Sequence, residues 1–170
     1  MLTGAHLHLL VNHVPILGAL FALGLLLASF LWAPDVLRKT ALVVLIGVAV
    51  AGVIADKSGD PAEKAIQGFP GVSRDRIHAH EDAAGKAYLT AGLVGVLALG
   101  ILIRWRREPV PAGATAAALA GAVLVSGLMG YTGLLGGRVR HTEVRPGASS
   151  ADAMTIEPPR PRRPAPPAQP

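Results

Sequence analysis

The fold of this chain is decided by its first long apolar run, LLVNHVPILGALFALGLLLASFLW, which occupies residues 9–32. A helix needs about 20 predominantly apolar residues to cross the hydrocarbon core of a bilayer. Three further segments reach this length, at about 36–55, 84–103 and 114–135, and none carries an acid or a base in its central stretch. Because none shows a polar stripe, each helix is expected to face lipid or protein on every side. The sequence therefore predicts an all-α, integral membrane four-helix transmembrane bundle.

The composition agrees with this class and excludes others. Of the 170 residues, 51% are hydrophobic and 16% are charged, whereas about a quarter of a typical soluble domain is charged. The absence of cysteine excludes disulfides, thiolate zinc sites and covalently attached c-type haem. The net charge of +5 comes from short loops and a terminal tail, so no nucleic-acid partner is expected. We expect a four-helix domain over residues 1–145 and a disordered tail, rich in Pro and Arg, over 146–170.

The longest loop, residues 56–83, contains a helix signal of its own. Asp60-Pro61-Ala62-Glu63 supplies a capping carboxylate, a proline at the first helical position and an acid at the third. Gly68 is a typical helix end. The loop between the second and third spans is therefore predicted to hold one short interfacial helix over the end of the bundle, as a lid or as a spacer among lipid headgroups.

The histidines carry most of the functional information. There are six of them, at positions 6, 8, 13, 78, 80 and 141. Four crossings of the bilayer place all six on one face, together with both termini. The deepest is His13, which is followed by Val14-Pro15 inside an apolar helix, and an ionisable residue in such a place is a functional hypothesis by default. The opposite face has no histidine, so the chain alone is not expected to carry electrons across a membrane on two haems.

Two cofactor chemistries fit a one-sided histidine cluster. Imidazoles from facing helices are suitable axial ligands for haem b. Imidazoles with a carboxylate such as Glu81 are suitable ligands for zinc or copper. The candidate cofactor ligands are His13, His80 and His141, with His8 as an alternate, Arg140 as a charge partner and Glu81 as a metal ligand or a neighbour of the ligands. For any single histidine the alternative is an ordinary interfacial residue that hydrogen-bonds headgroups, water or helix ends. Hydrolase motifs are missing, so an enzyme activity of the chain on its own is not expected.

Three segments resemble a family of small four-helix bacterial membrane proteins without an assigned activity. They are HLLVNHVPILG at 8–18, GDPAEKAIQGFPGVSRDRIHAHEDAA at 59–84 and LLGGRVRHTEVR at 134–145, so the resemblance covers about residues 8–145. The family pattern carries over onto His8, Asn12, His13, Pro15, Gly59, Pro61, Glu63, Pro70, Gly71, His80, Glu81, Gly136, Gly137, Arg140, His141, Glu143 and Arg145. His6 and His78 lie outside it and are the weakest candidate ligands. The chain is also loosely similar to predicted membrane domains that are sometimes joined to cytochrome c modules, which implies a place near respiratory electron transfer.

Two functions from different classes are expected on these grounds. The first is a haem b- or metal-binding redox or respiratory accessory subunit, whose partner is another membrane or respiratory-complex subunit; a homo-oligomer is left open. The second is a cofactor-free scaffold or assembly protein that binds a larger membrane complex. A quinone pocket near Tyr88 and Tyr131 ranks third. The glycines of the third and fourth spans favour close helix packing over a cofactor groove, namely Gly92, Gly95, Gly127, Gly130, Gly133 and Gly136.

The loops suggest a location and an orientation. The face without histidine holds a dense cationic set, Arg38, Lys39, Arg104, Arg106 and Arg107. Cytoplasmic loops of membrane proteins carry an excess of Lys and Arg. We therefore expect a multi-pass protein of the bacterial inner membrane, with both termini and the histidine face in the periplasm. The arginines that follow the fourth span weaken this assignment.

Overall fold

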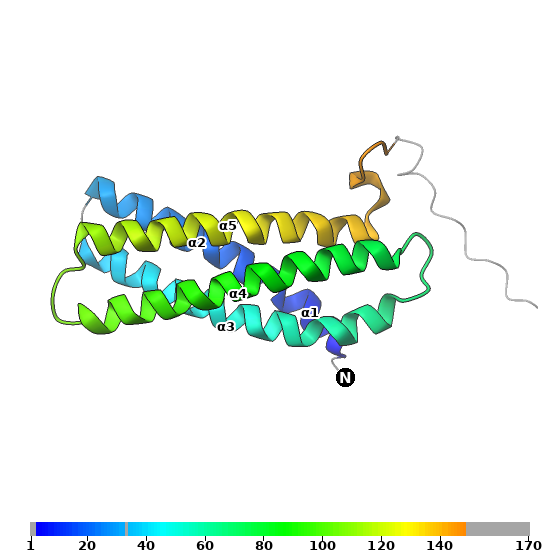
Figure 1. The fold of residues 1–170 in the computed structure, drawn as a ribbon, viewed down its shortest axis with the longest axis horizontal. Coiled ribbons are helices and arrows are strands. Elements are labelled where there is room, and N and C mark those ends of the chain that lie inside the picture. Colours follow the sequence, from blue (N-terminus) through cyan, green and yellow to red (C-terminus); the bar gives the residue numbers. More distant parts are fainter. Residues whose placement is uncertain (1–2, 33, 149–170) are drawn as a thin grey trace, which may run out of the picture.

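The structure is a computed structural model that describes residues 3–32 and 34–148. Its helices are α1 (Gly4–Val11), α2 (His13–Trp32), α3 (Asp35–Ile66), α4 (Arg74–Arg104), α5 (Ala112–Arg140) and the 3-10 turn η1 (Thr142–Val144). The long helices lie side by side in one bundle, and α1 lies at the end where α3 finishes, α4 begins and α5 finishes (Figure 1). Most of the predicted tail, residues 149–170, falls outside the described residues.

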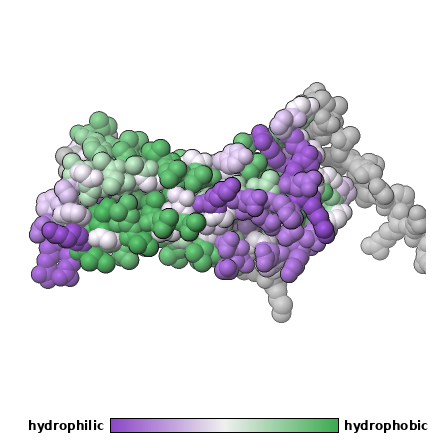
Figure 2. Space-filling model, in the orientation of Figure 1, coloured by the Kyte–Doolittle hydropathy of each residue, from purple (hydrophilic) through white to green (hydrophobic). Residues whose placement is uncertain are grey.

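The all-α prediction is confirmed over the described residues. Four helical stretches are long and apolar enough to cross a membrane, Gly4–Trp32, Asp35–Ile66, Arg74–Arg104 and Ala112–Arg140. All four extend beyond the predicted apolar spans, mainly at the histidine end. Figure 2 shows the consequence: a broad hydrophobic surface covers the middle of the bundle, and a large hydrophilic surface covers the histidine end.

The predicted short helix between the second and third spans is not a separate element. Helix α3 runs without a break from Asp35 to Ile66 with Pro61 inside it, so the predicted helix is the last part of α3. The predicted end is confirmed, because Gly68 adopts φ +82° just after α3. Asp60-Pro61 therefore does not start a new helix, although its sequence is a helix-start signal. Tertiary packing accompanies the continuous helix, because the start of α1 lies directly on α3 at Pro61, where a Cβ atom at Gly4 would overlap the Pro61 side chain.

The core is built mainly from small side chains. Fully buried positions include Ala19, Ala22, Ala41, Ala87, Ala91, Ala98, Ala118 and Ala122, together with Leu26, Leu45, Val125 and Met129. Larger apolar side chains such as Phe21, Leu93 and Val96 point outward and are exposed. This arrangement is typical of membrane helices, where small residues let backbones approach each other while large apolar side chains face lipid.

The glycines predicted to pack helices divide into two groups. A Cβ atom at Gly95, Gly133 or Gly136 would lie 2.6 Å from Ala49 Cβ, 3.2 Å from Ile16 Cδ1 or 3.0 Å from His80 Cε1, respectively. These three glycines therefore pack against neighbouring helices, as predicted. In contrast, a Cβ atom at Gly92, Gly127 or Gly130 would meet nothing within 4 Å, so these three do not serve packing inside the bundle.

At the end opposite the histidines, the start of α3 holds the turn between α4 and α5. Asp35 Oδ1 accepts a hydrogen bond from Val110 N at 2.7 Å, and its other carboxylate oxygen pairs with Lys39 Nζ at 2.7 Å. Arg38 Nη1 donates to Val110 O at 2.9 Å. Arg38 and Lys39, which belong to the cationic set that suggests the orientation of the chain, therefore also stabilise this turn.

Candidate histidine site

All six histidines lie at the same end of the bundle, as the sequence predicts. His6 and His8 belong to α1, His13 begins α2, His78 and His80 lie near the start of α4, and His141 follows the end of α5. In Figure 1, α1 lies in the half of the bundle where α3 ends, α4 begins and α5 ends, and the start of α2 is further from this end than the start of α4. Sharing an end of the bundle does not place the six imidazoles in one cluster, and the structure separates them by their contacts.

His8 is held between α1 and α3. Its Nδ1 atom lies 3.1 Å from the backbone oxygen of Ala55 and 3.1 Å from Ser58 Oγ. Ser58 is itself buried and donates its hydroxyl proton to the same Ala55 oxygen at 2.9 Å. The imidazole of His8 is half-buried against α3 and has a defined orientation.

His80 is held in the same way between α4 and α5. Its Nδ1 atom lies 3.0 Å from the backbone oxygen of Thr132. The ring rests on the backbone of α5 at Gly136, where a Cβ atom would lie 3.0 Å from His80 Cε1 and 3.2 Å from Nδ1. Any side chain at position 136 would therefore crowd the imidazole in this position, and the glycine lets the ring lie against the helix.

The hydrogen bonds of His8 and His80 determine which ring nitrogen is available. A carbonyl oxygen can only accept a hydrogen bond, so Nδ1 must carry the proton in both residues. In the neutral imidazole Nε2 then keeps its lone pair. Histidines that bind metals almost always donate their other N–H to a carbonyl or carboxylate in this way, which fixes the tautomer and the orientation of the ring. The two imidazoles also lie close enough to interact electrostatically.

The other predicted ligands do not join this pair. His13 is exposed on the surface of α2. The imidazole of His141, with its side chain 62% exposed, is hydrogen-bonded through Nδ1 to Glu143 Oε1 at 2.8 Å. Glu81 is exposed and faces another carboxylate, that of Glu63. Among residues 3–32 and 34–148, no group of three or more His, Asp or Glu side chains is placed to hold a metal ion.

Arg140, the predicted charge partner, has a structural contact instead. Its guanidinium lies over the ring of Phe69, 5.4 Å from the ring centre, and Nη1 donates to Pro70 O at 3.5 Å. These contacts connect the end of α5 to the turn between α3 and α4. His6 also has a local role, because its side chain and the Thr3 hydroxyl form a capping box at the start of α1.

The Glu143 carboxylate stabilises the turn after α5. A hydrogen bond from its own backbone N–H, and then the hydrogen bond from His141, lower the pKa of Glu143. Glu143 is therefore ionised throughout the neutral range, and its Oε1 atom holds the Nδ1 atom of His141 at 2.8 Å. The exposed ring of His141 also lacks the half-buried surroundings of His8 and His80, so His141 is the weaker candidate ligand.

Sequence reasoning missed the partners that make the His8 and His80 positions distinct. These are the backbone oxygens of Ala55 and Thr132 and the Ser58 hydroxyl. Every residue has a backbone oxygen, so the sequence does not indicate which ones bind a histidine, and nothing in it distinguishes Ser58 from the other serines.

Asn12 lies at the break between α1 and α2. Its buried Oδ1 atom has no hydrogen-bond partner among the described residues.

Comparison with known protein families, with characterised proteins and with solved structures finds no match for this chain. Its class therefore follows from its own sequence and fold. The chain is an all-α protein with four helices long and apolar enough to cross a membrane. At one end of its bundle, two half-buried histidines present oriented Nε2 atoms.

Proposed function

We propose that this chain is a multi-pass protein of the bacterial inner membrane that binds a haem b through His8 and His80 and serves as a redox accessory subunit of a larger respiratory assembly. The observation that carries the proposal is the shared geometry of the two imidazoles. Each is half-buried, each donates Nδ1–H to a backbone oxygen at 3.0–3.1 Å, and each keeps Nε2 as a free donor of an electron pair.

The number of suitable side chains favours haem over a bare metal ion. Two imidazoles complete the axial ligands of a haem iron, and cofactors in helical bundles are held by side chains on facing helices. Zinc takes four protein ligands in structural sites and usually three in catalytic sites, and no such group occurs among the described residues. A bound haem would supply one-electron chemistry, and the chain would orient the imidazoles through their hydrogen bonds to Ala55 O and Thr132 O.

The proposal is tested by a dithionite-reduced minus oxidised absorption spectrum of the full chain, purified in mild detergent from haem-sufficient cells. We expect a sharp Soret and α-band change at near-stoichiometric level. His8→Ala and His80→Ala are each expected to lower haem occupancy by about tenfold or more, because each removes an axial ligand. His78→Ala is the matched control, because His78 is exposed on the same helix as His80 and should leave the spectrum unchanged.

A flat spectrum of the wild-type chain would reject haem binding. Equal losses in His78→Ala and His80→Ala would also contradict the assignment, since they would point to a general loss of fold. Elemental analysis of the same preparations detects zinc or copper, and a stoichiometric metal lost in both His8→Ala and His80→Ala would replace haem by that metal at the same site.

The proposed location and orientation rest on the cationic end of the bundle. This end consists of the start of α3, the end of α4 and the turn between α4 and α5, and it contains Arg38, Lys39, Arg104, Arg106 and Arg107. Such an excess of Lys and Arg favours the cytoplasm for this end. Because the chain has no cysteine, single cysteines report topology without background. In intact spheroplasts, a membrane-impermeant maleimide is expected to label Ser73→Cys and to leave Arg107→Cys unlabelled until the membrane is opened. The reverse pattern would invert the orientation, and labelling of both would contradict an odd number of crossings between the two sites.

A second candidate, a cofactor-free scaffold, is favoured by one observation. Three glycines of the transmembrane-length helices α4 and α5, Gly92, Gly127 and Gly130, have open space beside them, because a Cβ atom at any of these positions would meet nothing within 4 Å. In a bilayer, such small residues allow the backbone of another helix to approach closely. A colourless, metal-free chain that copurifies with one membrane protein in stoichiometric amount would favour this candidate over the redox subunit.

A further inference from the structure

A second feature of the histidine end is a cavity of about 230 Å³ between α4, α5 and the residues after η1. Its lining consists of three arginines and three apolar residues, Arg76, Arg138, Arg145, Ala79, Leu135 and Pro146. No acidic residue is part of this lining. The cavity lies at the same level along α4 and α5 as the contact between His80 and Gly136, because Ala79 and Leu135 precede these residues in the two helices.

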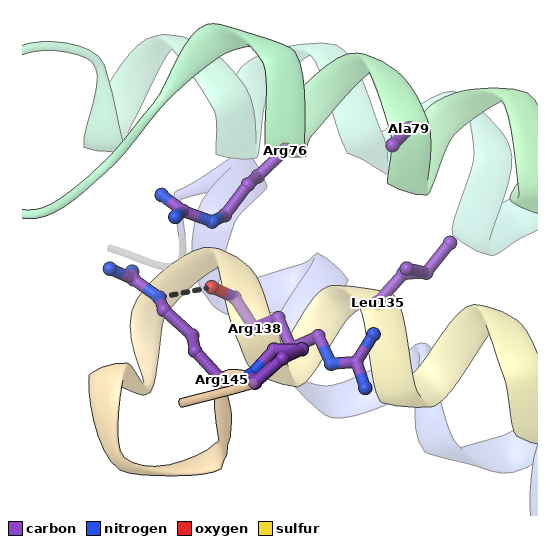
Figure 3. Close-up of a pocket in the computed structure, with 6 residues that line it drawn as sticks. Arg76, Ala79, Leu135, Arg138 and Arg145 are labelled. Atoms are coloured by element: carbon purple, nitrogen blue, oxygen red, sulfur yellow. Dashed lines mark hydrogen bonds between the residues drawn. The ribbon is translucent and has the colours of Figure 1, made fainter. Parts of the chain in front are cut away.

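The three guanidinium groups are arranged differently around the cavity. Figure 3 shows Arg76 of α4 and Arg145 reaching to the same side of it, while the guanidinium of Arg138 extends along α5 to the side of Leu135. Arg76 and Arg145 therefore offer their guanidinium groups to one side of the cavity, and Arg138 adds a third positive charge on the other side.

Arg145 is held in place by backbone oxygens. Its Nε donates to Arg138 O at 3.0 Å, and one terminal nitrogen, Nη2, donates to Gly71 O at 2.8 Å and to Val139 O at 3.1 Å. These bonds neutralise none of its charge, and within the described part of the chain the other terminal nitrogen, Nη1, keeps both donors free. Arg145 is therefore an oriented cation with unused hydrogen-bond donors.

The other two arginines are also uncompensated. The Nε atom of Arg138 is buried and has no hydrogen-bond partner among the described residues. Arg76 is exposed, and residues 3–32 and 34–148 offer it no ion pair or hydrogen bond. Arg145 has one negative neighbour outside the lining, because Glu143 interacts with it electrostatically; three arginines against this single carboxylate leave the cavity with a net positive charge.

Three like charges beside an apolar wall repel each other unless a negative group lies among them. A guanidinium presents a planar fork of N–H donors that matches the oxygens of a phosphate. The cavity is smaller than the pockets of about 300–1,000 Å³ that hold drug-sized ligands. Its lining comes from the start of α4, the end of α5 and the residues after η1. This is the end of the bundle with the large hydrophilic surface (Figure 2), and in a protein that crosses a bilayer such polar ends lie at the level of the headgroups.

We propose that this cavity is a binding site for a phosphate group, and that Arg76, Arg138 and Arg145 are the residues that bind it. The phosphate belongs either to an anionic phospholipid headgroup or to a soluble phosphate compound, since both offer the same oxygens. The site is independent of the proposed haem, because none of its six lining residues is a candidate axial ligand.

The test uses the full chain in an uncharged detergent with two probes. Native mass spectrometry counts phosphatidylglycerol bound per chain, and isothermal titration calorimetry measures binding of inorganic phosphate. We expect saturable binding of one phosphate-bearing molecule in one arm or in both, and the arm that responds identifies the source of the phosphate. Arg76→Gln and Arg138→Gln are expected to weaken that binding by about tenfold each, because charge-assisted hydrogen bonds are lost.

Arg74→Gln is the matched control, because Arg74 is exposed at the start of the same helix and does not line the cavity. It removes the same charge and should change binding less than about twofold. His8→Ala protein, which lacks a proposed haem ligand, should bind the probe as wild type does. This result would show that the arginines bind the phosphate independently of any haem, whose carboxylates could otherwise be their partners. Absence of saturable binding in both arms, equal weakening by Arg74→Gln and Arg76→Gln, or loss of binding in His8→Ala would overturn the proposal.

Discussion

Replacement of Gly95 by leucine is expected to lower the free energy of unfolding of the bundle by about 3 kcal/mol. Gly95 is buried where α4 crosses α3, and even a Cβ atom there would lie 2.6 Å from Ala49 Cβ and 3.6 Å from the backbone oxygen of Leu45. Part of what surrounds it is helix backbone, which does not move aside as a flexible side chain does. A leucine at this position must therefore push α3 and α4 apart, and the small-residue core between them loses its contacts.

The effect is measured by titration of detergent-solubilised protein with sodium dodecyl sulfate, followed by circular dichroism and tryptophan fluorescence. Gly92→Leu is the matched control, one turn earlier on α4, because a Cβ atom at Gly92 meets nothing within 4 Å. Both substitutions add the same apolar volume to the same helix. A similar loss of stability in both variants would contradict the close packing of α3 and α4 at Gly95.

Replacement of Gly136 by leucine is expected to displace the imidazole of His80. A Cβ atom at position 136 would lie 3.0–3.2 Å from two ring atoms of His80, and the rest of a leucine side chain must occupy more of the same space. The ring then moves away, and the hydrogen bond from Nδ1 to Thr132 O is lost. Overpacking and the lost hydrogen bond together are expected to cost about 2–3 kcal/mol of stability.

The same substitution tests the histidine site without removing a ligand. If His80 binds haem in this orientation, Gly136→Leu lowers haem occupancy by about tenfold or more, as loss of a residue that orients a ligand usually does. Gly137→Leu is the control, because its Cβ atom would meet nothing within 4 Å. The ring resonances of His80 in a histidine-labelled sample report its displacement even in a chain that binds no cofactor. Unchanged resonances in Gly136→Leu would contradict the packing of His80 on α5.

His80 and the arginine-lined cavity occupy neighbouring positions along α4 and α5, whereas His8 lies between α1 and α3. His80 lies against Gly136, and the residues next to them, Ala79 and Leu135, line the cavity. Both features depend on the long polar extensions of the helices beyond the apolar belt. A redox subunit with a phosphate site at this end would present two chemistries to a partner on one surface.

The four helices were predictable because their signal is local. A run of about 20 apolar residues has few alternatives to a membrane-length helix. Each of the four helices can therefore be predicted from its own residues alone. The shared end of the six histidines followed from the same count, since each crossing reverses direction. Small residues at the packed positions, such as Gly95, were also visible, although the sequence did not separate them from Gly92, Gly127 and Gly130, which face outward.

The candidate site was less predictable because its geometry depends on contacts between distant residues. His13 is the deepest of the six histidines in the apolar run, yet the rotation of α2 in the bundle turns it to the surface. His8 ranked below it, although α3 orients its ring. The Asp60-Pro61 signal predicted a new helix, and the packing of α1 on Pro61 accompanies the unbroken α3 instead.

The sequence by itself thus determined the helical class, the number of membrane-length helices and the end of the bundle that carries the histidines, because apolar length and the order of the chain are enough for these. Only the tertiary structure decided which imidazoles are held and which arginines share a cavity. His8 is oriented by a backbone oxygen 47 residues away in sequence and His80 by one 52 residues away. Such pairings exist only after the helices have packed, because a backbone oxygen has no residue-specific signature.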